Sequence, residues 1–196
     1  MTSRLERITE QRLESLNKIR DRGIDPYPHS YHPTHTIREA IALFEQQQES
    51  SQEISLAGRI VSKRSIGKMS FLDIRDGSGK IQLSLRFDLL GQEKYEFLQD
   101  VDIGDIVGAR GKLFRTKAGE LTLEASDFTM LSKSLRPLPE KWHGLADVEK
   151  RYRQRYLELI SNEDSRRIFV LRSKIIAAVR DVLVTRDFRG GVSPRL

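Results

Sequence analysis

Three side chains that could bind a nucleic-acid base lie on segments of alternating hydrophobicity. Phe71 alternates with Leu72 and Ile74, so it is predicted to share the polar face of its strand. Gln82 and Glu120 fall on the polar faces of two later segments. An aromatic ring can stack on a flat ligand, an amide can donate and accept a hydrogen bond, and a carboxylate can accept one. Together these groups can read an unstacked base.

Each of the three residues also has a simpler interpretation. Phe71 could pack under an N-terminal helix, or be one of the single exposed apolar residues that are common on protein surfaces. Glu120 could be only a turn residue. Gln82 could be an ordinary solvent-facing residue of a strand. The alternation by itself leaves both interpretations open for each residue.

Five strands must position these side chains, and they are predicted at residues 54–65, 69–75, 80–86, 105–114 and 120–131. A short helix is predicted at 91–99, between the third and fourth strands. This order fits the five-stranded Greek-key barrel called the OB-fold. That barrel binds oligonucleotides on strands two and three, with the loops joining strands one to two and four to five. Phe71 and Gln82 fall on those two strands, and Glu120 lies at the edge of the last loop.

Helices are predicted on both sides of the barrel, so the fold class is mainly β with flanking helices (α+β). Their predicted ranges are 3–22, 36–48, 147–161 and 163–187. We therefore expect three parts: a helical extension at 1–52, an OB-fold domain at 53–132, and a connector with further helices at 133–196. An Arg- and Tyr-rich run at 151–156 is interpreted as a solvated helix face or a packing surface.

Composition permits a polyanionic partner without requiring one, because the formal net charge is +6. The chain has no cysteine, which excludes disulfides and thiolate metal sites. The histidines lack helical metal-ligand spacing, so no metal site is expected. No long apolar run or signal peptide is present, and the expected location is cytoplasmic.

Four segments resemble the N-terminal region of bacterial lysyl-tRNA synthetase, a class II aminoacyl-tRNA synthetase. They are RGIDPYPHSY at 22–31, GKMSFLDIRDGSGKIQLSLR at 67–86, GDIVGARGKLFRTKAGELTL at 104–123 and KSLRPLPEKWHGLADVEKRYRQRYLELI at 133–160. The resemblance implies that the barrel binds the anticodon loop of tRNA. It implies that Phe71 stacks on the central anticodon uracil, that Gln82 and Glu120 line the base pocket, and that Arg64 contacts the backbone or a base edge. Phosphate contacts are expected from Lys63, Lys68, Arg115 and Lys117.

The chain departs from this family near its end. Residues 165–188 match the helix of motif 1, which builds the dimer interface in the full-length family. The stretch after it reads Phe188-Arg189-Gly190-Gly191-Val192-Ser193-Pro194, where the family pattern is F-x-E-V-x-T-P. Motifs 2 and 3, with the residues that bind ATP, Mg²⁺ and lysine, are absent. We therefore expect a chain truncated within motif 1, with no cofactor of its own, that binds tRNA without charging it.

Two further hypotheses remain. The chain could be a free-standing OB-fold module for RNA or single-stranded DNA, unconnected to charging. Alternatively, the apolar stripe of the helix at 163–187 could drive association of the chain, because its partners in the family are a second subunit and a catalytic sheet. The stripe residues are Ile168, Leu171, Ile175, Val179 and Leu183.

Overall fold

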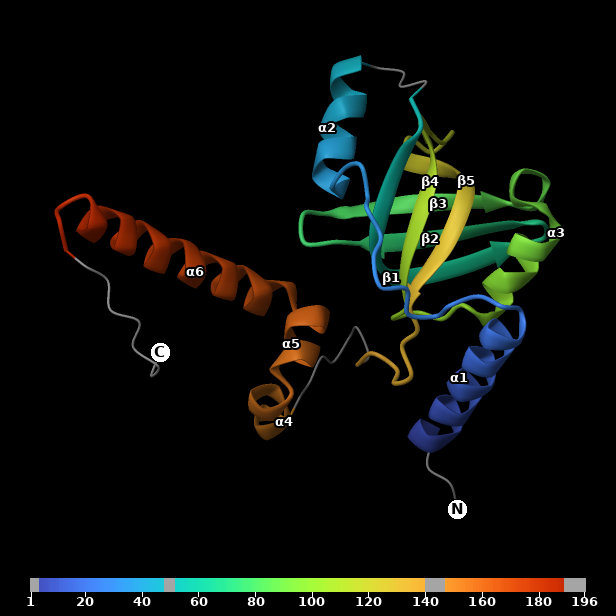
Figure 1. Ribbon diagram of the computed structural model, residues 1–196, viewed down its shortest axis with the longest axis horizontal. Coiled ribbons are helices and arrows are strands. Elements are labelled where there is room, and N and C mark those ends of the chain that lie inside the picture. Colours follow the sequence, from blue (N-terminus) through green and yellow to red (C-terminus); the bar gives the residue numbers. More distant parts are fainter. Residues whose placement is uncertain (1–3, 48–51, 140–146, 189–196) are drawn as a thin grey trace. The chain divides into compact units, whose positions relative to one another are not determined.

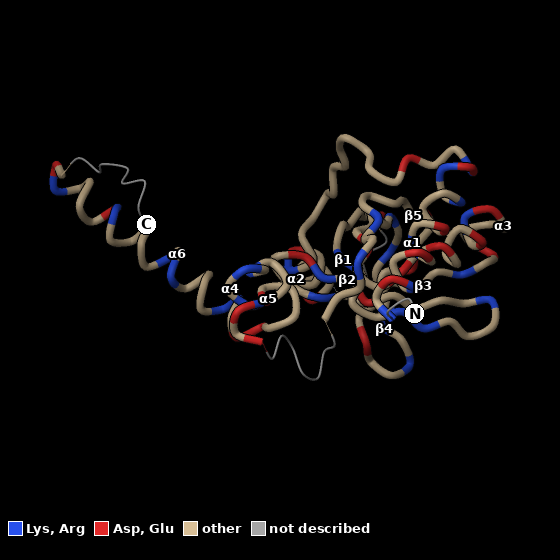
Figure 2. The backbone as a smooth tube through the Cα atoms, turned by 90° about the horizontal axis from the view of Figure 1, so that it is seen from below, with Lys and Arg blue, Asp and Glu red and all other residues tan. Residues whose placement is uncertain are grey.

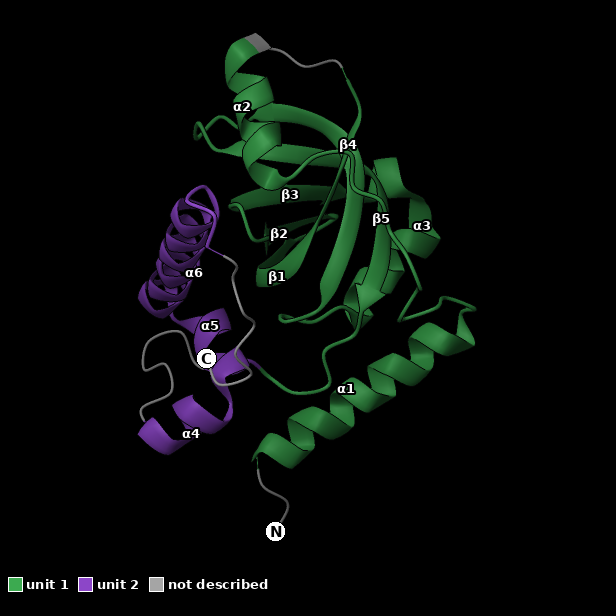
Figure 3. Ribbon diagram, turned by 60° about the vertical axis from the view of Figure 1, so that its left-hand side comes forward, with its two compact units in different colours: residues 1–137 green, residues 138–196 purple. Residues whose placement is uncertain are grey.

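The structure is a computed structural model that describes residues 4–47, 52–139 and 147–188. The chain divides into two compact units, Met1–Pro137 and Leu138–Leu196 (Figure 3). The first unit contains the strands, and the described residues of the second form helices and no strand. Lys and Arg are interspersed with Asp and Glu along both units (Figure 2). The segment 188–194, where the motif 1 pattern was predicted to break down, lies outside the described residues from 189 onward.

Five strands form a closed barrel in the order β1-β2-β3-β5-β4 (Figure 1). Only the β3–β5 pair is parallel, and the other four pairs are antiparallel. This confirms the predicted five-stranded OB-type barrel. The strands are β1 (Ile54–Ile66), β2 (Met69–Arg75), β3 (Lys80–Arg86), β4 (Ile106–Arg115) and β5 (Leu121–Ser132), each within one residue of its predicted bounds.

The barrel interior holds the apolar residues that the alternation predicted to face inward. In β2 and β3 the inward side chains are branched aliphatics that pack to near-zero exposure. The fully buried ones include Leu56, Ile60, Leu72, Ile74, Leu83, Leu85 and Leu123. Because this inward set is fixed, the odd-numbered residues of β2, including Phe71, must point to the outer face.

A β-bulge in β1 reverses the alternation within that strand. Ile60 pairs with Ile74, but the next pair is Ser62 with Asp73, so Val61 is the extra residue. Beyond the bulge, Lys63 pairs with the inward-facing Leu72 and Arg64 with the outward-facing Phe71. Without the bulge the even-numbered Arg64 would face inward with Ile60, so the bulge turns Lys63 inward and Arg64 outward.

Helices α1 (Arg4–Asp21) and α2 (Ile37–Gln47) confirm the two predicted N-terminal helices. Asp76, in the β2–β3 turn, docks α2: its carboxylate accepts from the Ile37 amide at 2.9 Å and from both the amide and hydroxyl of Ser78 at 2.7 Å. Partial burial opposes ionisation of Asp76, but these hydrogen bonds and that of the Gly79 amide outweigh it, and its pKa is lowered.

The helix predicted at 91–99 differs in the structure. Helix α3 spans Phe87–Phe97 and continues as a 3-10 turn, η1, at Leu98–Asp100. Gly91 interrupts α3 with φ 77° and ψ 168°, a backbone conformation that glycine adopts without strain. The sequence prediction began at this glycine and so missed the first turn. Helix α3 and α2 lie at opposite ends of the β2–β3 pair (Figure 1).

Basic side chains hold η1 and the turn after it, at the base of the barrel. The Lys133 ammonium is fully buried and lies 2.9 Å from Asp105 and 2.6 Å from Asp102. Arg12 of α1 donates to the Ile103 carbonyl at 2.9 Å and also to the carbonyls of Ser134 and Arg136. Residues 133–136, predicted to begin the connector, are therefore held by the first unit.

The second unit consists of α4 (Val148–Arg153), α5 (Arg155–Ser161) and α6 (Glu163–Val184). The sequence predicted one helix over 147–161. The structure corrects this to two helices, because Gln154 has φ −116° and ψ 52°. Asp147 caps α4 as predicted, accepting from the Glu149 amide at 2.9 Å. Helix α6 ends three residues before the predicted position.

Candidate nucleic-acid interface

The predicted base-binding residues lie in two adjacent rows on the outer face of the barrel. In the first row Arg64 of β1 pairs with Phe71 of β2, which pairs with Ser84 of β3. In the next row Gln82 of β3 pairs with Asp73 of β2. Because neighbouring rows on one face are about 7 Å apart along a strand, Arg64, Phe71 and Gln82 share one surface.

Phe71 is half-buried on this surface. Its alternative role was to pack under the N-terminal helix. That helix, α1, packs instead against η1, and its buried Arg12 is bonded to the base of the barrel. The position of α1 therefore favours the platform interpretation of Phe71, which stays a prediction.

Gln82 faces outward but is only 4% exposed, so it is not the ordinary solvent-facing residue of the alternative interpretation. Its Oε1 accepts a hydrogen bond from the Thr122 hydroxyl at 3.1 Å, and its Nε2 donates to the Glu120 carboxylate at 3.1 Å. Thr122 itself is fully buried. The three side chains form a connected polar network in which the amide is held at both ends.

The structure confirms that Glu120 is a turn residue, while its role in base binding stays a prediction. Its backbone closes the β4–β5 turn, since its amide donates to the Thr116 hydroxyl at 3.1 Å and its carbonyl accepts from the Thr116 amide at 3.0 Å. Its side chain is exposed and reaches back to Gln82. The turn thus places a carboxylate beside the amide, with one face open to solvent.

The predicted phosphate contacts divide into two groups. Within the described ranges, Arg64, Lys68 and Lys117 are exposed and pair with no carboxylate. Such charges are available to a polyanion. Arg115 is partly engaged, because its guanidinium donates to the Gly119 carbonyl at 3.0 Å and lies 5.7 Å from the Phe44 ring centre.

Lys63 does not lie with the other basic residues. Its ammonium points away from the base-binding face and donates to the carbonyls of Leu98 and Val101 at 2.5 and 2.7 Å. Burial lowers the pKa of Lys63, against the opposing effect of Asp102. The ammonium of Lys63 is thus engaged within the first unit, and its predicted phosphate contact stays untested.

Sequence reasoning did not single out Thr122. It lies between two apolar residues on β5 and resembles any outward polar residue of an alternating strand. Its importance comes from the parallel pairing of Gln82 with Thr122 across β3 and β5. That pairing joins segments 40 residues apart, and no local pattern indicates it.

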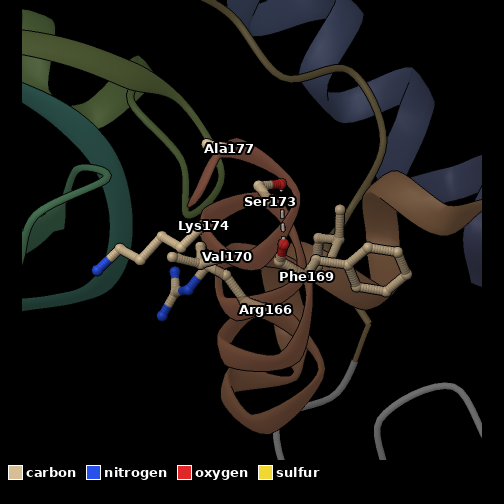
Figure 4. Close-up of a pocket in the computed structure, with 7 residues that line it drawn as sticks. Arg166, Phe169, Val170, Ser173, Lys174 and Ala177 are labelled. Carbon is tan, nitrogen blue, oxygen red and sulfur yellow. Dashed lines mark hydrogen bonds between the residues drawn. The ribbon is translucent and has the colours of Figure 1, made fainter. Parts of the chain in front are cut away.

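The second unit contributes a different surface. All five predicted stripe residues of α6 are exposed, with 43% to 64% of each residue accessible. A shallow apolar hollow lies beside them, lined by Leu159 of α5 and by α6 residues that include Phe169 and Val170 (Figure 4). In the Arg- and Tyr-rich run, Arg155 lies 5.0 Å from the ring centres of both Tyr152 and Phe169. The described part of this unit therefore presents an apolar surface on α6 beside an Arg–aromatic cluster.

Among residues 4–47, 52–139 and 147–188, no group of three or more His, Asp or Glu side chains could hold a metal ion. In the same part of the chain, no helix is long and apolar enough to cross a membrane.

The barrel and the chain as a whole are both similar to known proteins. Residues 54–131 match the family model for the OB-fold nucleic acid binding domain of the tRNA anticodon type. A lysine–tRNA ligase of Dehalococcoides mccartyi is 52% identical over 93% of this chain. Those of Moorella thermoacetica and Lysinibacillus sphaericus are 49% and 47% identical over 90% and 99% of it. The chain spans only 36–40% of the length of these relatives. Over nearly all of its length the chain is thus similar to part of these bacterial lysine–tRNA ligases, and its barrel matches an OB-fold nucleic acid binding domain.

Proposed function

We propose that the first unit binds the anticodon loop of a lysine tRNA and holds its central uracil on Phe71. The observation that carries this proposal is the Gln82–Thr122–Glu120 network, set one row from an outward aromatic side chain. The OB-fold match and the names of the relatives support tRNA as the polyanion. A stacked base contributes about 1–3 kcal/mol to such complexes.

The hydrogen-bonding groups on this face suit the edge of uracil. That edge presents a carbonyl, an N–H and a second carbonyl in succession. Gln82 uses one Nε2 hydrogen for Glu120 and retains the other, the Glu120 carboxylate retains acceptor capacity, and Arg64 offers donors. Uracil needs two donors and one acceptor, which is the number that these three side chains supply, whereas cytosine presents an amino group and a bare ring nitrogen in place of its first carbonyl and its N–H. Lys68 and Lys117 add attraction for phosphates that is independent of sequence.

A complete lysine–tRNA ligase activity would belong to a protein as long as the relatives, of which this chain spans 36–40%. We infer that, in such a protein, this unit recognises tRNA for ATP-dependent attachment of lysine in the cytoplasm. The second unit would then join a catalytic domain that binds ATP and Mg²⁺. The exposed apolar face of α6 suits association with that domain and with a second subunit, as expected for a homodimer.

Binding of an RNA anticodon stem-loop tests the proposal. Phe71→Ala should weaken binding by roughly 5- to 150-fold at fixed salt, since it removes the stacking platform. Leu89→Ala is the matched control, because Leu89 is an exposed apolar residue on α3, outside the two rows. An affinity that Phe71→Ala leaves unchanged would remove Phe71 from base recognition.

The free-standing module is the competing function, and the same assay separates it. Wild-type protein should prefer the lysine anticodon stem-loop over unrelated single strands of equal length. Equal affinity for all of these strands would favour a general OB-fold binder, whose grip depends on charge and stacking alone.

A further inference from the structure

Thr122 is the one fully buried member of the base-binding network. It lies on β5, directly opposite Gln82 of β3 in the parallel pair that closes the barrel (Figure 1). Its exposure is 0%, and its hydroxyl donates to Gln82 Oε1 at 3.1 Å. The Glu120 carbonyl offers a second acceptor at 3.3 Å. The hydroxyl carries one hydrogen, which it donates to the nearer acceptor, Gln82 Oε1, with the Glu120 carbonyl as the competing acceptor.

The Gln82 amide has two possible orientations related by a half-turn, and its neighbours distinguish between them. With Oε1 toward Thr122, both ends of the amide are satisfied. With Oε1 toward Glu120, two acceptor oxygens would face each other at about hydrogen-bond distance, which is unfavourable for an ionised carboxylate. The Glu120 carboxylate thus selects this orientation, and the hydrogen that Thr122 donates to Oε1 reinforces it.

We propose that Thr122 is a positioning residue for base recognition. By holding Gln82 Oε1, it keeps an Nε2 hydrogen aimed at the base, so that the site accepts a pyrimidine carbonyl and rejects an amino group. This inference rests on the proposed function and adds the cause of its specificity. Thr122 is too deeply buried to touch the base itself and acts only through Gln82.

The size of the effect follows from the hydrogen bond that is lost. In Thr122→Val the side-chain volume is nearly kept, but Gln82 Oε1 loses its donor and the amide can sample other orientations. We expect the preference for uracil over cytosine to fall by about 3- to 10-fold. Thr122→Ser keeps the hydroxyl, so it should retain the wild-type preference.

The experiment compares two RNA stem-loops that differ only in uracil or cytosine at the central anticodon position. Dissociation constants for wild type, Thr122→Val and Thr122→Ser give a preference ratio for each protein. A general loss of stability would weaken both complexes together and leave the ratio unchanged. Wild-type preference kept by Thr122→Ser and reduced in Thr122→Val is the expected result.

Two outcomes would overturn the inference separately from the proposed function. An unchanged ratio in a folded Thr122→Val protein would show that Thr122 has no positioning role, while the proposed function stands. A wild-type ratio of one would overturn the proposed function, and the positioning role with it.

A measurement on wild-type protein covers the case in which Thr122→Val does not fold. The Gln82 side-chain amide protons should exchange with solvent more slowly than those of the exposed Gln92. Exchange as fast as that of Gln92 would overturn the fixed orientation without any variant.

Discussion

Lys63 and Arg64 are adjacent in sequence, yet their substitution should have separate consequences. Lys63→Met removes an ammonium that donates to two carbonyls at 2.5 and 2.7 Å. Each hydrogen bond from a charged group contributes about 1.5–3 kcal/mol. Burial of the ammonium offsets part of this, as the lowered pKa of Lys63 indicates. We expect the free energy of unfolding to fall by about 1–3 kcal/mol.

Arg64→Met should give the opposite result. Arg64 is exposed, and in the described ranges it has no carboxylate partner, so the free energy of unfolding should change by less than about 0.5 kcal/mol. RNA binding should weaken. If Arg64 neutralises one phosphate, the slope of log affinity against log salt concentration should become shallower by about 0.7. Lys63→Met should leave that slope unchanged.

Urea denaturation followed by circular dichroism gives the unfolding free energy of each variant. Fluorescence anisotropy with an anticodon stem-loop at several salt concentrations gives the slope. The two variants serve as controls for each other, because each removes one positive charge from adjacent positions. A shallower slope with unchanged stability in Lys63→Met would refute the inward assignment of Lys63 and restore the phosphate contact that the sequence predicted.

Three further predictions concern the scaffold. A Cβ at Gly111 would lie 1.9 Å from a backbone carbonyl of β5, so Gly111→Ala should cost about 3 kcal/mol or more in urea denaturation, whereas Gly77→Ala, with open space around it, should be tolerated. Asp76→Ala should lower stability by about 1–3 kcal/mol near neutral pH. Because folding lowers the pKa of Asp76 from 3.8, this difference should be present above that value and vanish as the pH falls through the folded-state pKa, as denaturation from pH about 2 to about 7 would show. Lys133→Met should cost about 3–5 kcal/mol by leaving the buried Asp105 unpaired, and adding Asp105→Asn should recover part of the melting temperature.

The barrel could be predicted from the sequence because its strands obey a period of two with few exceptions. Leu72 and Ile74 of β2, and Ile81, Leu83 and Leu85 of β3, fix which residues face inward. The face of Phe71 follows without any knowledge of the fold. A second local signal predicted where strands end, because connecting segments carry the turn residues Gly, Asp and Ser.

The departures come from features that no local period reveals. The bulge at Val61 shifts Lys63 to the inner face, and nothing in the composition of β1 marks the extra residue. The left-handed Gly91 sits inside a helix rather than at its start. The break at Gln154 divides the segment 147–161, which the sequence predicts to be one continuous helix. Each departure depends on contacts or backbone angles set by the rest of the unit.

The burial of Gln82 has a consequence for how a small barrel can read a base. An exposed glutamine would rotate freely and offer a donor or an acceptor in turn, so water and the wrong base could compete equally well. Holding the amide between Thr122 and Glu120 leaves one N–H available and places the cost of ordering the side chain on folding rather than on binding. Discrimination then requires a residue that never touches RNA. In the proposed complex, surface charges such as Lys68 and Lys117 would strengthen binding of any strand, so they would not supply this choice.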